Sequence, residues 1–336
     1  MMSQNLNIAL VGAWHVHAND YARDCANNPD ATLVAVWDDD ANRAAAAAER
    51  WQVPAVGSLA DLLADDSVDG VIITTATSQH PEVMAQVIAA GKHIFTEKVV
   101  AATTGDAEAI TVAADKAGIT LTVSLPRLYT GYTQAIDNVL ATGKLGETSY
   151  IRVRVSHDGA IRRDGNPQWL PETFFDRGQA MGGAMIDFGA HPYYLVNHFA
   201  GGLPETISAN YLSTSGHEVE DQALVVCNYP GRLTGVAEAS FLGGQIGMMI
   251  EIHGANGSLL FDFDHGVRTK VRGESDWLQR ELPADLPTPF DRWVTRIQNG
   301  EQDPDNVAMG LDLTRMAAAA EVSAAQRRPV SLNEGH

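Results

Sequence analysis

The feature that most constrains the fold is a regular alternation of short apolar runs with helix-like segments between residues 7 and 125. Five apolar runs predict buried strands, at 7–13, 32–38, 69–75, 92–98 and 119–125. Apolar residues at helical spacing predict helices between them, at 17–28, 41–51, 58–65, 81–91 and 104–118. Strands that alternate with helices form a parallel sheet covered on both faces. The first part of the chain is therefore expected to be a doubly wound α/β domain.

The rest of the chain has a different pattern, in which apolar and polar residues alternate along strand-like runs. These runs lie at 149–156, 205–213, 223–229, 233–241, 248–254 and 258–264. They predict a large, mainly antiparallel open sheet, and helices are predicted at 289–300 and 310–326. We therefore expect two α/β domains, 1–124 and 125–336, with the final helix able to pack back on the first.

Composition limits the partners of this chain. Lys and Arg number 23 and Asp and Glu 42, a net charge of −19 that repels nucleic acids and anionic membranes. No apolar run reaches the roughly 18 residues of a membrane span, and no secretion signal is recognisable, so we expect a cytoplasmic protein. Cys25 and Cys227 lie far apart and are expected to be buried thiols.

A glycine turn follows the first predicted strand, in the stretch VGAWHVH. Of the pattern G-x-G-x-x-G only Gly12 is present, with Trp14 and His17 at the second and third glycine positions. Asp38 ends the second strand, 26 residues beyond Gly12, where dinucleotide-binding folds place an acidic residue on the ribose hydroxyls. A helix cap or a solvated turn residue is the alternative. Asp39 adds a second carboxylate with no arginine beside the pair, which favours NAD over NADP.

Candidate catalytic residues stand in two other segments. Glu97 and Lys98 end the fourth predicted strand, at the edge where open parallel sheets bind ligands. Asp187 and His191 are four residues apart, which places them on one face of a helix unless Pro192 breaks or kinks it. The alternatives are a solvated lysine, a capping aspartate and a histidine buried in the core.

Several aromatic and basic residues are candidates for substrate contacts. Trp and Tyr offer flat faces to a sugar ring, and Arg or His offer hydrogen-bond donors to its hydroxyls. The candidates follow the fifth strand or precede the Asp187 segment: Arg127, Tyr129, Tyr132, His157, Arg162, Arg163 and Trp169. His15 and His17 form an H-x-H pair without a third ligand nearby in the sequence, so we expect no metal; they are expected to line the cofactor phosphates or the pocket mouth.

These motifs occur in an order that resembles a known family. Gly12 and Asp38 are followed by TTATSQH, AGKHIFTEK, GGAMIDFGAH, LATGKLGETSYIRVRV, VEDQALVVCNYPG, IEIHGANGSLLFD and RRPVSL. The ordered set covers nearly the whole chain and resembles the glucose-fructose oxidoreductase and inositol dehydrogenase (Gfo/Idh/MocA) family. In two places the sequence departs from that family, which usually has a second glycine at Trp14 and a proline at Val99.

The resemblance implies roles for individual residues. Lys98 of the E-K motif and Asp187 and His191 of the D-x-x-x-H motif become a catalytic set. The cofactor-binding residues become Gly12, Ala13, Trp14, His15, Asp38, Thr75, Thr77, His80, Glu97 and Lys98. The substrate-binding residues become Arg127, Tyr129, Tyr132, His157, Arg163, Trp169, Asp187 and His191. The family's open sheet usually forms a subunit interface.

The function expected from residues and resemblance together is an NAD-dependent dehydrogenase that oxidises a secondary hydroxyl of a sugar, cyclitol or sugar derivative, or catalyses the reverse reaction. His191 would act as the general base, Asp187 would orient it or share the substrate hydroxyl, and Lys98 would stabilise alkoxide character or take part in proton transfer. Two alternatives stay open. One is a glycoside-cleaving or eliminating enzyme that recycles bound NAD, and the other is a non-catalytic sugar or NAD sensor.

A homodimer or homotetramer is also expected. The strands between residues 205 and 265 have no helices left in the sequence to cover their second face. The run 246–254 supplies apolar residues suited to an interface.

Overall fold

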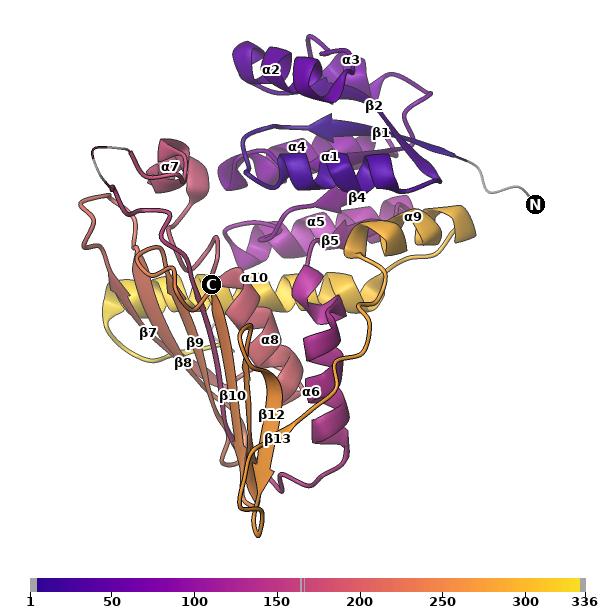
Figure 1. The fold of residues 1–336 in the computed structure, drawn as a ribbon. Helices are drawn as coiled ribbons and strands as arrows, with labels where there is room; N and C mark the ends of the chain where they lie inside the picture. The colour runs from indigo at the N-terminus through magenta and orange to yellow at the C-terminus, as the bar shows by residue number, and fades with distance from the viewer. Residues whose placement is uncertain (1–4, 164, 166, 333–336) are drawn as a thin grey trace. The chain divides into compact units, whose positions relative to one another are not determined.

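The structure is a computed structural model that describes residues 5–163, 165 and 167–332. The chain divides into two compact units (Figure 1). The first unit comprises Met1–Ser124 and Pro287–Leu311, and the second comprises Leu125–Leu286 and Asp312–His336. Helix α10 (Pro304–Gln326) begins in the first unit and continues into the second.

The first unit contains a parallel sheet of five strands in the order β2-β1-β3-β4-β5. The strands are β1 (Leu6–Val11), β2 (Ala31–Trp37), β3 (Gly70–Ile73), β4 (His93–Thr96) and β5 (Leu121–Val123). Its helical segments are α1 (Ala18–Asn27), α2 (Ala41–Trp51), α3 (Leu59–Leu63), η1 (Thr77–Gln79), α4 (His80–Ala89), α5 (Thr104–Ala117) and α9 (Pro289–Asn299). The predicted doubly wound parallel sheet is confirmed.

The order of these strands creates a topological switch point at the carboxyl edge of the sheet. β2 lies on one side of β1, whereas β3 lies on the other, so the connections after β1 and β3 leave in opposite directions. Open parallel sheets bind ligands at the carboxyl ends of two such strands. Gly12 follows β1 and Thr74 follows β3, which places both residues at this point.

Helix starts in the first unit follow ordinary capping chemistry. Asp40 accepts hydrogen bonds from the backbone N–H groups of Asn42 and Arg43 at the start of α2, and Thr103 accepts one from Asp106 at the start of α5. α5 ends at Gly118, whose φ of +68° suits a residue without a side chain. These local signals explain why the predicted helices form where they do.

A late segment of the chain completes the core of the first unit. Phe290 and Trp293 of α9 pack with Phe95 of β4, and all three side chains are at most 1% exposed. Trp293 Nε1 donates to the carbonyl of Thr120 at 3.2 Å. Asn306 pairs with both backbone groups of Val123 and so fixes β5.

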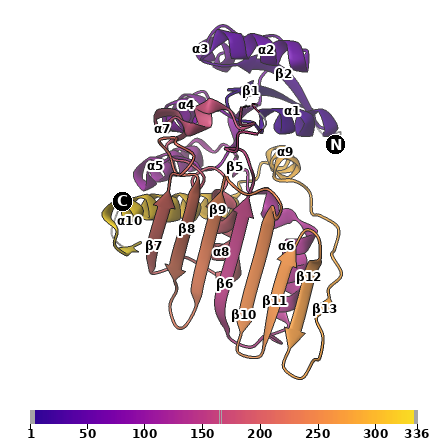
Figure 2. The same ribbon diagram turned by 60° about the vertical axis from the view of Figure 1, so that its left-hand side comes forward.

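The second unit contains a sheet of nine strands, which Figure 2 shows face on, in the order β13-β12-β11-β10-β6-β9-β8-β7-β14. The strands are β6 (Thr148–Ser156), β7 (Thr206–Leu212), β8 (Gln222–Asn228), β9 (Thr234–Ser240), β10 (Met248–Gly254), β11 (Gly257–Asp262), β12 (Gly266–Val271), β13 (Leu278–Gln279) and β14 (Val330–Ser331). Neighbours pair antiparallel except β6 and β9, which are parallel. The predicted large, mainly antiparallel sheet is confirmed.

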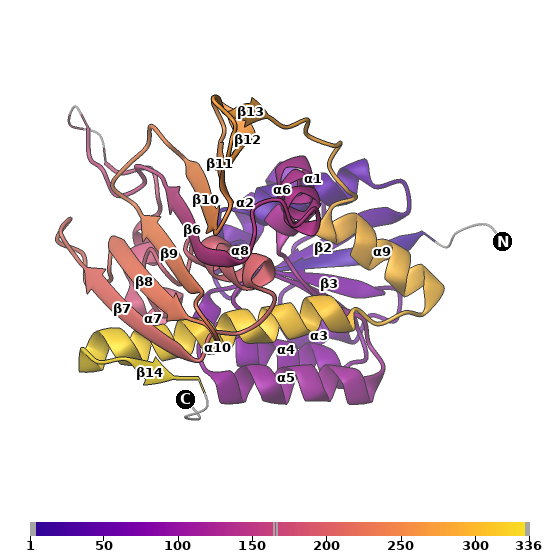
Figure 3. The same ribbon diagram turned by 90° about the horizontal axis from the view of Figure 1, so that it is seen from below.

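Helices α6 (Gly131–Ala141), α8 (Ala190–Ala200) and the second-unit part of α10 lie on one face of this sheet (Figure 3). Two shorter segments, η3 (Glu172–Phe175) and α7 (Arg177–Ala180), precede α8, and η2 (Pro126–Tyr129) precedes α6. Met248, Ile250 and Ile252 of β10 are fully buried. The expectation that these three residues serve a subunit interface is therefore wrong, because strand alternation points them into the core.

The opposite face of the sheet is more polar. Arg152 of β6 forms ion pairs with Glu238 of β9 at 2.6 Å and with Glu251 of β10 at 3.1 Å, and all three side chains are partly exposed. This row of paired charges therefore lies on the face of the sheet that the helices do not cover.

Two smaller expectations can be compared with the structure. Cys25 and Cys227 are free and fully buried, as predicted. Among the described residues, no helix combines the length and apolarity that crossing a membrane requires.

Candidate functional site

The turn after β1 requires glycine at its first position. Gly12 has a φ of +91°, and a Cβ atom added there would lie 2.5 Å from the backbone nitrogen of Thr75. Thr74 donates from Oγ1 to the carbonyl of Gly12 at 2.5 Å, and its own carbonyl accepts from His15 N at 3.1 Å. The turn is thereby joined to the segment that follows β3, so that backbone comes close to any ligand bound at the switch point.

Two buried polar atoms beside this turn lack a hydrogen-bond partner among the described residues. They are Thr75 Oγ1 and His80 Nε2. His80 Nδ1 pairs with the carbonyl of Val99 at 2.9 Å, and burial lowers the pKa of this imidazole. Thr77, another predicted cofactor residue, begins η1 directly after this segment. Unpaired buried groups are costly, so these atoms suit a polar ligand.

Trp14 is 7% exposed. Its indole is therefore packed within the protein and does not project from the turn into solvent. The centroids of the Trp14 and His15 rings lie 6.1 Å apart.

The acidic group after β2 has an arginine beside it, contrary to the expectation from the sequence. Arg43 of α2 lies 2.8 Å from Asp38 and 2.6 Å from Asp39. Arg43 stands in the first turn of α2, shortly after the two aspartates, and its long side chain reaches back to both carboxylates. Asp38 also accepts from Ala13 N at 2.7 Å and Asp40 N at 2.7 Å, and burial raises its pKa.

A buried polar cluster surrounds Glu97 at the end of β4. Glu97 Oε1 pairs with His17 Nδ1 at 2.7 Å, lies 3.7 Å from His15 Nδ1 and accepts from the hydroxyl of Tyr21. Glu97 Oε2 accepts from Lys98 N at 2.9 Å and lies 3.8 Å from Lys98 Nζ. Glu97 is 1% and Lys98 4% exposed, so the lysine is not the solvated strand-end charge of the alternative interpretation.

The charges in this cluster determine the ionisation of Glu97. Burial opposes the charged form, but the positive charges of His15, Lys98 and His17 together lower the pKa of Glu97 well below its ordinary value. Burial, followed by the charge of Glu97, raises the pKa of Tyr21. The carboxylate therefore stays ionised and binds three positively charged or donating side chains at once.

His15, His17 and Glu97 offer ligand atoms that all lie within 4.8 Å of one another. The premise that the H-x-H pair has no third ligand nearby holds only along the sequence, since the fold brings Glu97 to it. The absence of a metal stays a prediction.

Lys98 and Val99 are joined by a cis peptide bond. Both residues are buried, and the carbonyl of Val99 is the partner of His80 Nδ1. The lysine backbone and the residue that replaces the family's proline are thus both held by side chains of the first unit.

In the second unit, His191 belongs to a chain of hydrogen bonds. His191 is 4% exposed, and its Nδ1 lies 2.8 Å from the hydroxyl oxygen of Tyr194. The same oxygen accepts from Arg127 N at 3.2 Å. If His191 Nδ1 carries the proton and donates to Tyr194, Nε2 is the basic nitrogen.

Arg127 has a buried Nε with no hydrogen-bond partner among the described residues. Its Nη1 donates to the hydroxyl of Tyr132 at 3.3 Å, and its guanidinium lies 5.9 Å from the ring centroid of Phe263. Tyr132 stacks on Phe261 with ring centroids 4.3 Å apart. Tyr132 is therefore mainly a core residue, whereas Arg127 keeps a donor available.

Asp187 lies in the turn directly before α8, and Pro192 does not break that helix. α8 begins at Ala190, so Pro192 stands in its first turn, where no intrahelical N–H is needed. Asp187 N donates to the carbonyl of Gly183 at 3.1 Å, and His191 N donates to that of Phe188 at 3.2 Å. Asp187 and His191 thus stand on successive turns of a backbone that is already winding into the helix.

The remaining substrate candidates gather in an aromatic cluster. The ring of His157 lies 4.8 Å from Phe241, 4.9 Å from Trp169 and 4.7 Å from Phe188. Trp169 is 56% exposed and donates from Nε1 to Asp158, and Arg163 pairs with the same carboxylate at 2.9 Å. Tyr129 and Arg162 lie elsewhere: Tyr129 closes η2, and Arg162 bonds Gln168.

The structure joins some predicted residues into two groups, one in each unit. Glu97, Lys98, His15 and Asp38 border the switch point of the first unit, and Arg127 and His191 share Tyr194 in the second. Sequence reasoning missed Tyr21, Arg43 and Tyr194. Tyr194 lies three residues after His191, a helical neighbour spacing that was available as a signal.

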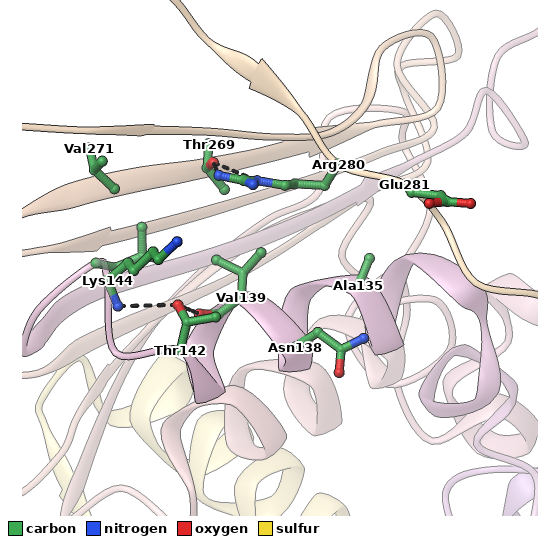
Figure 4. Close-up of a pocket in the computed structure, with 10 residues that line it drawn as sticks. Ala135, Asn138, Val139, Thr142, Lys144, Thr269, Val271, Arg280 and Glu281 are labelled. Carbon is green, nitrogen blue, oxygen red and sulfur yellow. Dashed lines mark hydrogen bonds between the residues drawn. The ribbon is translucent and has the colours of Figure 1, made fainter. Parts of the chain in front are cut away.

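A separate pocket of about 220 Å³ lies between α6 and β12 in the second unit (Figure 4). Its lining comprises Ala135, Asn138, Val139, Thr142, Lys144, Leu145, Thr269, Val271, Arg280 and Glu281. Arg280 is turned to Thr269 Oγ1 at 2.8 Å. None of the predicted site residues lines this pocket.

Comparison with known proteins identifies related sequences over both units. The family described as an oxidoreductase family with an NAD-binding Rossmann fold (GFO_IDH_MocA) matches residues 6–125, and the GFO/IDH/MocA C-terminal domain matches residues 133–260. 1,5-Anhydro-D-fructose reductase from Ensifer adhaerens is 27% identical over 75% of this chain and 74% of its own length.

Two further relatives bear on the cofactor. scyllo-Inositol 2-dehydrogenase (NADP(+)) from Bacillus subtilis is 24% identical over 82% of each chain. The crystal structure of GenD2 from gentamicin A biosynthesis, in complex with NAD, superimposes with a TM-score of 0.81 at 25% identity and covers 98% of this chain and 97% of that one.

Proposed function

Because the chain belongs to the GFO/IDH/MocA oxidoreductase family, we propose that it is an NAD-dependent dehydrogenase. Its substrate is a sugar, cyclitol or sugar derivative, in which a secondary hydroxyl is oxidised to a ketone, or the reverse. The relatives named for 1,5-anhydro-D-fructose and scyllo-inositol support this class of substrate.

The observation that carries the proposal is the cradle at the switch point of the first unit. Gly12 admits no Cβ there, and Thr75 Oγ1 and His80 Nε2 are buried without partners among the described residues. Backbone and polar atoms of this kind fit the pyrophosphate of a dinucleotide. NAD supplies the hydride acceptor when it is bound.

Asp38 supports NAD as the form of the cofactor. Its carboxylate would accept hydrogen bonds from the ribose hydroxyls, and Asp39 adds negative charge where NADP carries a phosphate. Arg43 already pairs with both carboxylates, and it would have to leave them to bind a phosphate instead. The two acidic partners of this arginine therefore favour the cofactor without the phosphate.

The chain's own residues would manage the proton and the substrate oxygen. His191 would take the hydroxyl proton on Nε2, while Tyr194 holds Nδ1. Asp187 would orient the imidazole or bind the same hydroxyl. Lys98, whose buried ammonium lies near Glu97, would stabilise negative charge as it develops on the oxygen.

A screen for reduced cofactor tests the proposal. Monosaccharides, cyclitols, anhydrosugars and glycosides are offered with NAD or NADP, NADH or NADPH is followed by absorbance, and bound cofactor is identified by mass spectrometry. We expect NADH with at least one polyhydroxylated substrate, formed about 10²-fold or more slowly by the Lys98→Met variant. Product without net NADH indicates a recycled cofactor instead, and tight binding of NAD and sugar without turnover indicates a sensor.

We also propose that the protein is a homodimer or homotetramer, with the polar face of the large sheet in the interface. Paired charges such as Arg152 with Glu238 and exposed apolar side chains such as Leu224 support this face. Sedimentation of a monomer at micromolar concentration contradicts the proposal.

The group of His15, His17 and Glu97 is proposed to work without a metal, since Glu97 Oε1 already pairs with His17 and Tyr21. Metal analysis of the purified protein tests this.

A further inference from the structure

Two carboxyl groups, the buried Glu220 and the partly exposed Glu321, lie against the segment 181–185, which leads to Asp187 and His191. Glu220 stands just before β8 and is 4% exposed, and Glu321 belongs to α10. All of these residues belong to the second unit. Neither carboxyl is one of the predicted catalytic or binding residues.

Glu220 holds the backbone of this segment through three hydrogen bonds. Its Oε1 accepts from Gly183 N at 2.9 Å and from Met185 N at 3.0 Å. Its backbone carbonyl accepts from Ala184 N at 2.8 Å. Three consecutive amides of the segment therefore end on one residue that is more than thirty positions away in the sequence.

The glycines of the segment permit this close approach. A Cβ on Gly183 would lie 2.0 Å from the carbonyl oxygen of Glu220, and a Cβ on Gly182 would lie 3.5 Å from Glu321 Oε1. Asp187 N in turn donates to the carbonyl of Gly183 at 3.1 Å. The position of Asp187 is thus built directly on the residue that Glu220 holds.

The two carboxyl groups are incompletely satisfied. Glu220 Oε2 and Glu321 Oε1 are buried and have no hydrogen-bond partner among the described residues. Arg177 supplies a cation, with Nη1 3.6 Å from Glu321 Oε2. Buried carboxylates that lie together disfavour double ionisation, as in any pair of like charges held away from water.

The groups that face the pair come from several elements. They are Arg177 of α7, Tyr193 of α8 and Tyr211 of β7, in addition to Glu220 and Glu321 themselves. Burial raises the pKa of Glu220, and burial together with the charge of Glu220 raises the pKa of Glu321 to about 7. Both tyrosines are neutral near pH 7, because burial raises their pKa well above the ordinary value.

We propose that Glu220 is a positioning residue for the segment that carries Asp187 and His191, and that it holds this segment best while the neighbouring Glu321 is uncharged. The role in catalysis rests on the proposed function. Ionisation of Glu321, whose ion-pair partner is Arg177, adds a second negative charge beside the segment, so the segment loosens as the pH rises through about 7.

Hydrogen exchange provides a test that does not depend on the substrate. Amide exchange of peptides that cover residues 181–191 is measured at pH 6 and pH 8.5 and corrected for the intrinsic pH dependence of exchange. In the wild type we expect about tenfold faster corrected exchange at pH 8.5, and in Glu321→Gln equal protection at the two pH values. Equal protection in the wild type overturns the role given to the charge of Glu321.

Substitutions of Glu220 separate its hydrogen bonds from its charge. Glu220→Gln keeps an oxygen acceptor and is expected to keep protection, whereas Glu220→Asp keeps the charge but loses the reach and is expected to exchange about tenfold faster. Glu205→Gln, an exposed carboxylate of the same unit, is the control. If the amides of residues 181–191 are as well protected in Glu220→Asp as in this control, the positioning role is overturned. The folding of each variant is checked by circular dichroism.

With a substrate in hand, kinetics give the second readout. Glu220→Asp should lower kcat about tenfold with little change in KM, and Glu321→Gln should retain activity above pH 7, where the wild type loses it. A wild-type pH profile in Glu321→Gln overturns the role given to the charge of Glu321. Failure to find any substrate refutes the proposed function and leaves the exchange result standing.

Discussion

Glu97 in the first unit and Glu220 in the second perform the same structural task in opposite electrostatic surroundings. Each carboxyl is buried and accepts hydrogen bonds from the backbone of a segment that carries predicted catalytic residues. Glu97 holds Lys98 N, and Glu220 holds Gly183 N and Met185 N. Glu97 is surrounded by His15, His17 and Lys98, whereas Glu220 lies against Glu321.

The difference shows that a hydrogen-bond pattern does not determine a charge state. Positive neighbours keep Glu97 ionised in spite of its burial, and its pKa falls. Burial without enough positive charge raises the pKa of Glu220. A carboxyl group can therefore anchor a backbone either where positive neighbours favour its ionised form or where burial disfavours it.

Replacing each glutamate with the isosteric glutamine should give the largest difference between the two sites. Glu97→Gln leaves the buried ammonium of Lys98 without its counterion, so we expect a loss of about 3 kcal/mol in the free energy of unfolding. Glu220→Gln removes no needed charge and should change stability by less than about 1 kcal/mol. Urea denaturation at pH 6.5 measures both, and equal losses in the two variants contradict the comparison.

Lys98→Met tests whether the cluster around Glu97 serves chemistry as well as structure. The substitution keeps the length of the side chain and deletes its charge. If the ammonium stabilises the developing alkoxide, turnover should fall about 10²-fold or more while NAD affinity stays within a few fold. Steady-state kinetics and calorimetric titration with NAD check this, and normal turnover shows that the lysine is not catalytic.

His191→Ala extends this test to the second unit. Turnover should fall about 10²-fold, the scale of general base catalysis, and the acidic limb of the rate profile should disappear. If both groups act on one hydroxyl, as proposed, the double variant with Lys98→Met should lose less than the product of the two single losses. A fully multiplicative loss means that the two residues act independently.

Much of the fold follows from local signals in the sequence. The five parallel strands were predicted from apolar runs, and Asp40, Thr103 and Gly118 cap helices as their residue types predict. Helix α6 and strand β12 were not predicted. In β12 (GVRTKV) polar and apolar residues do alternate, but the run is short and offers only Val267 and Val271 as apolar residues, so the signal is weak.

The site residues that escaped prediction depend on contacts between distant segments. Tyr21 reaches Glu97 across 76 positions, and Glu220 reaches Gly183 across 37. Each is an ordinary residue in its own stretch of sequence. Arg43 is only five residues from Asp38 in the sequence. It lies beside Asp38 because α2 starts at Ala41 and the side chain of Arg43 points back from its first turn.

Asp38 is a third buried carboxyl, intermediate between the two compared above, because burial raises its pKa while Arg43 pairs with it. Asp38→Ala removes the proposed ribose acceptor and should weaken NAD binding about 10-fold, equivalent to about 1.4 kcal/mol. The affinity for NADP should change less, so the preference for NAD over NADP should decrease. Calorimetric titration with both cofactors measures the effect, and an unchanged NAD affinity rejects the ribose role.

The pH dependence of stability should reveal Glu321. Its ordinary pKa of 4.5 rises to about 7 in the folded protein, so the folded state binds the proton more tightly than the unfolded state. Its contribution to stability is therefore complete below pH 4.5 and is lost as the pH rises through about 7. Urea denaturation between pH 5.5 and 8.5 should show that the free energy of unfolding declines less in Glu321→Gln than in the wild type. If the two free energies change with pH in parallel, the raised pKa of Glu321 is contradicted.

The smallest effect is expected at Tyr194. Its hydroxyl contacts the side chain of His191, whereas Glu97 and Glu220 bind backbone amides. Its hydroxyl oxygen lies 2.8 Å from His191 Nδ1 and accepts from Arg127 N. Tyr194→Phe removes both contacts, and the loss of the one to His191, worth about 1 kcal/mol, should lower turnover about fivefold. Because a proton on Nδ1 is then no longer stabilised by Tyr194, less of the imidazole has Nε2 as its basic nitrogen, and kcat should fall more than KM changes. Steady-state kinetics check this. A variant in which KM rises fivefold at constant kcat shows that Tyr194 contributes to substrate binding through Arg127 and does not orient the base.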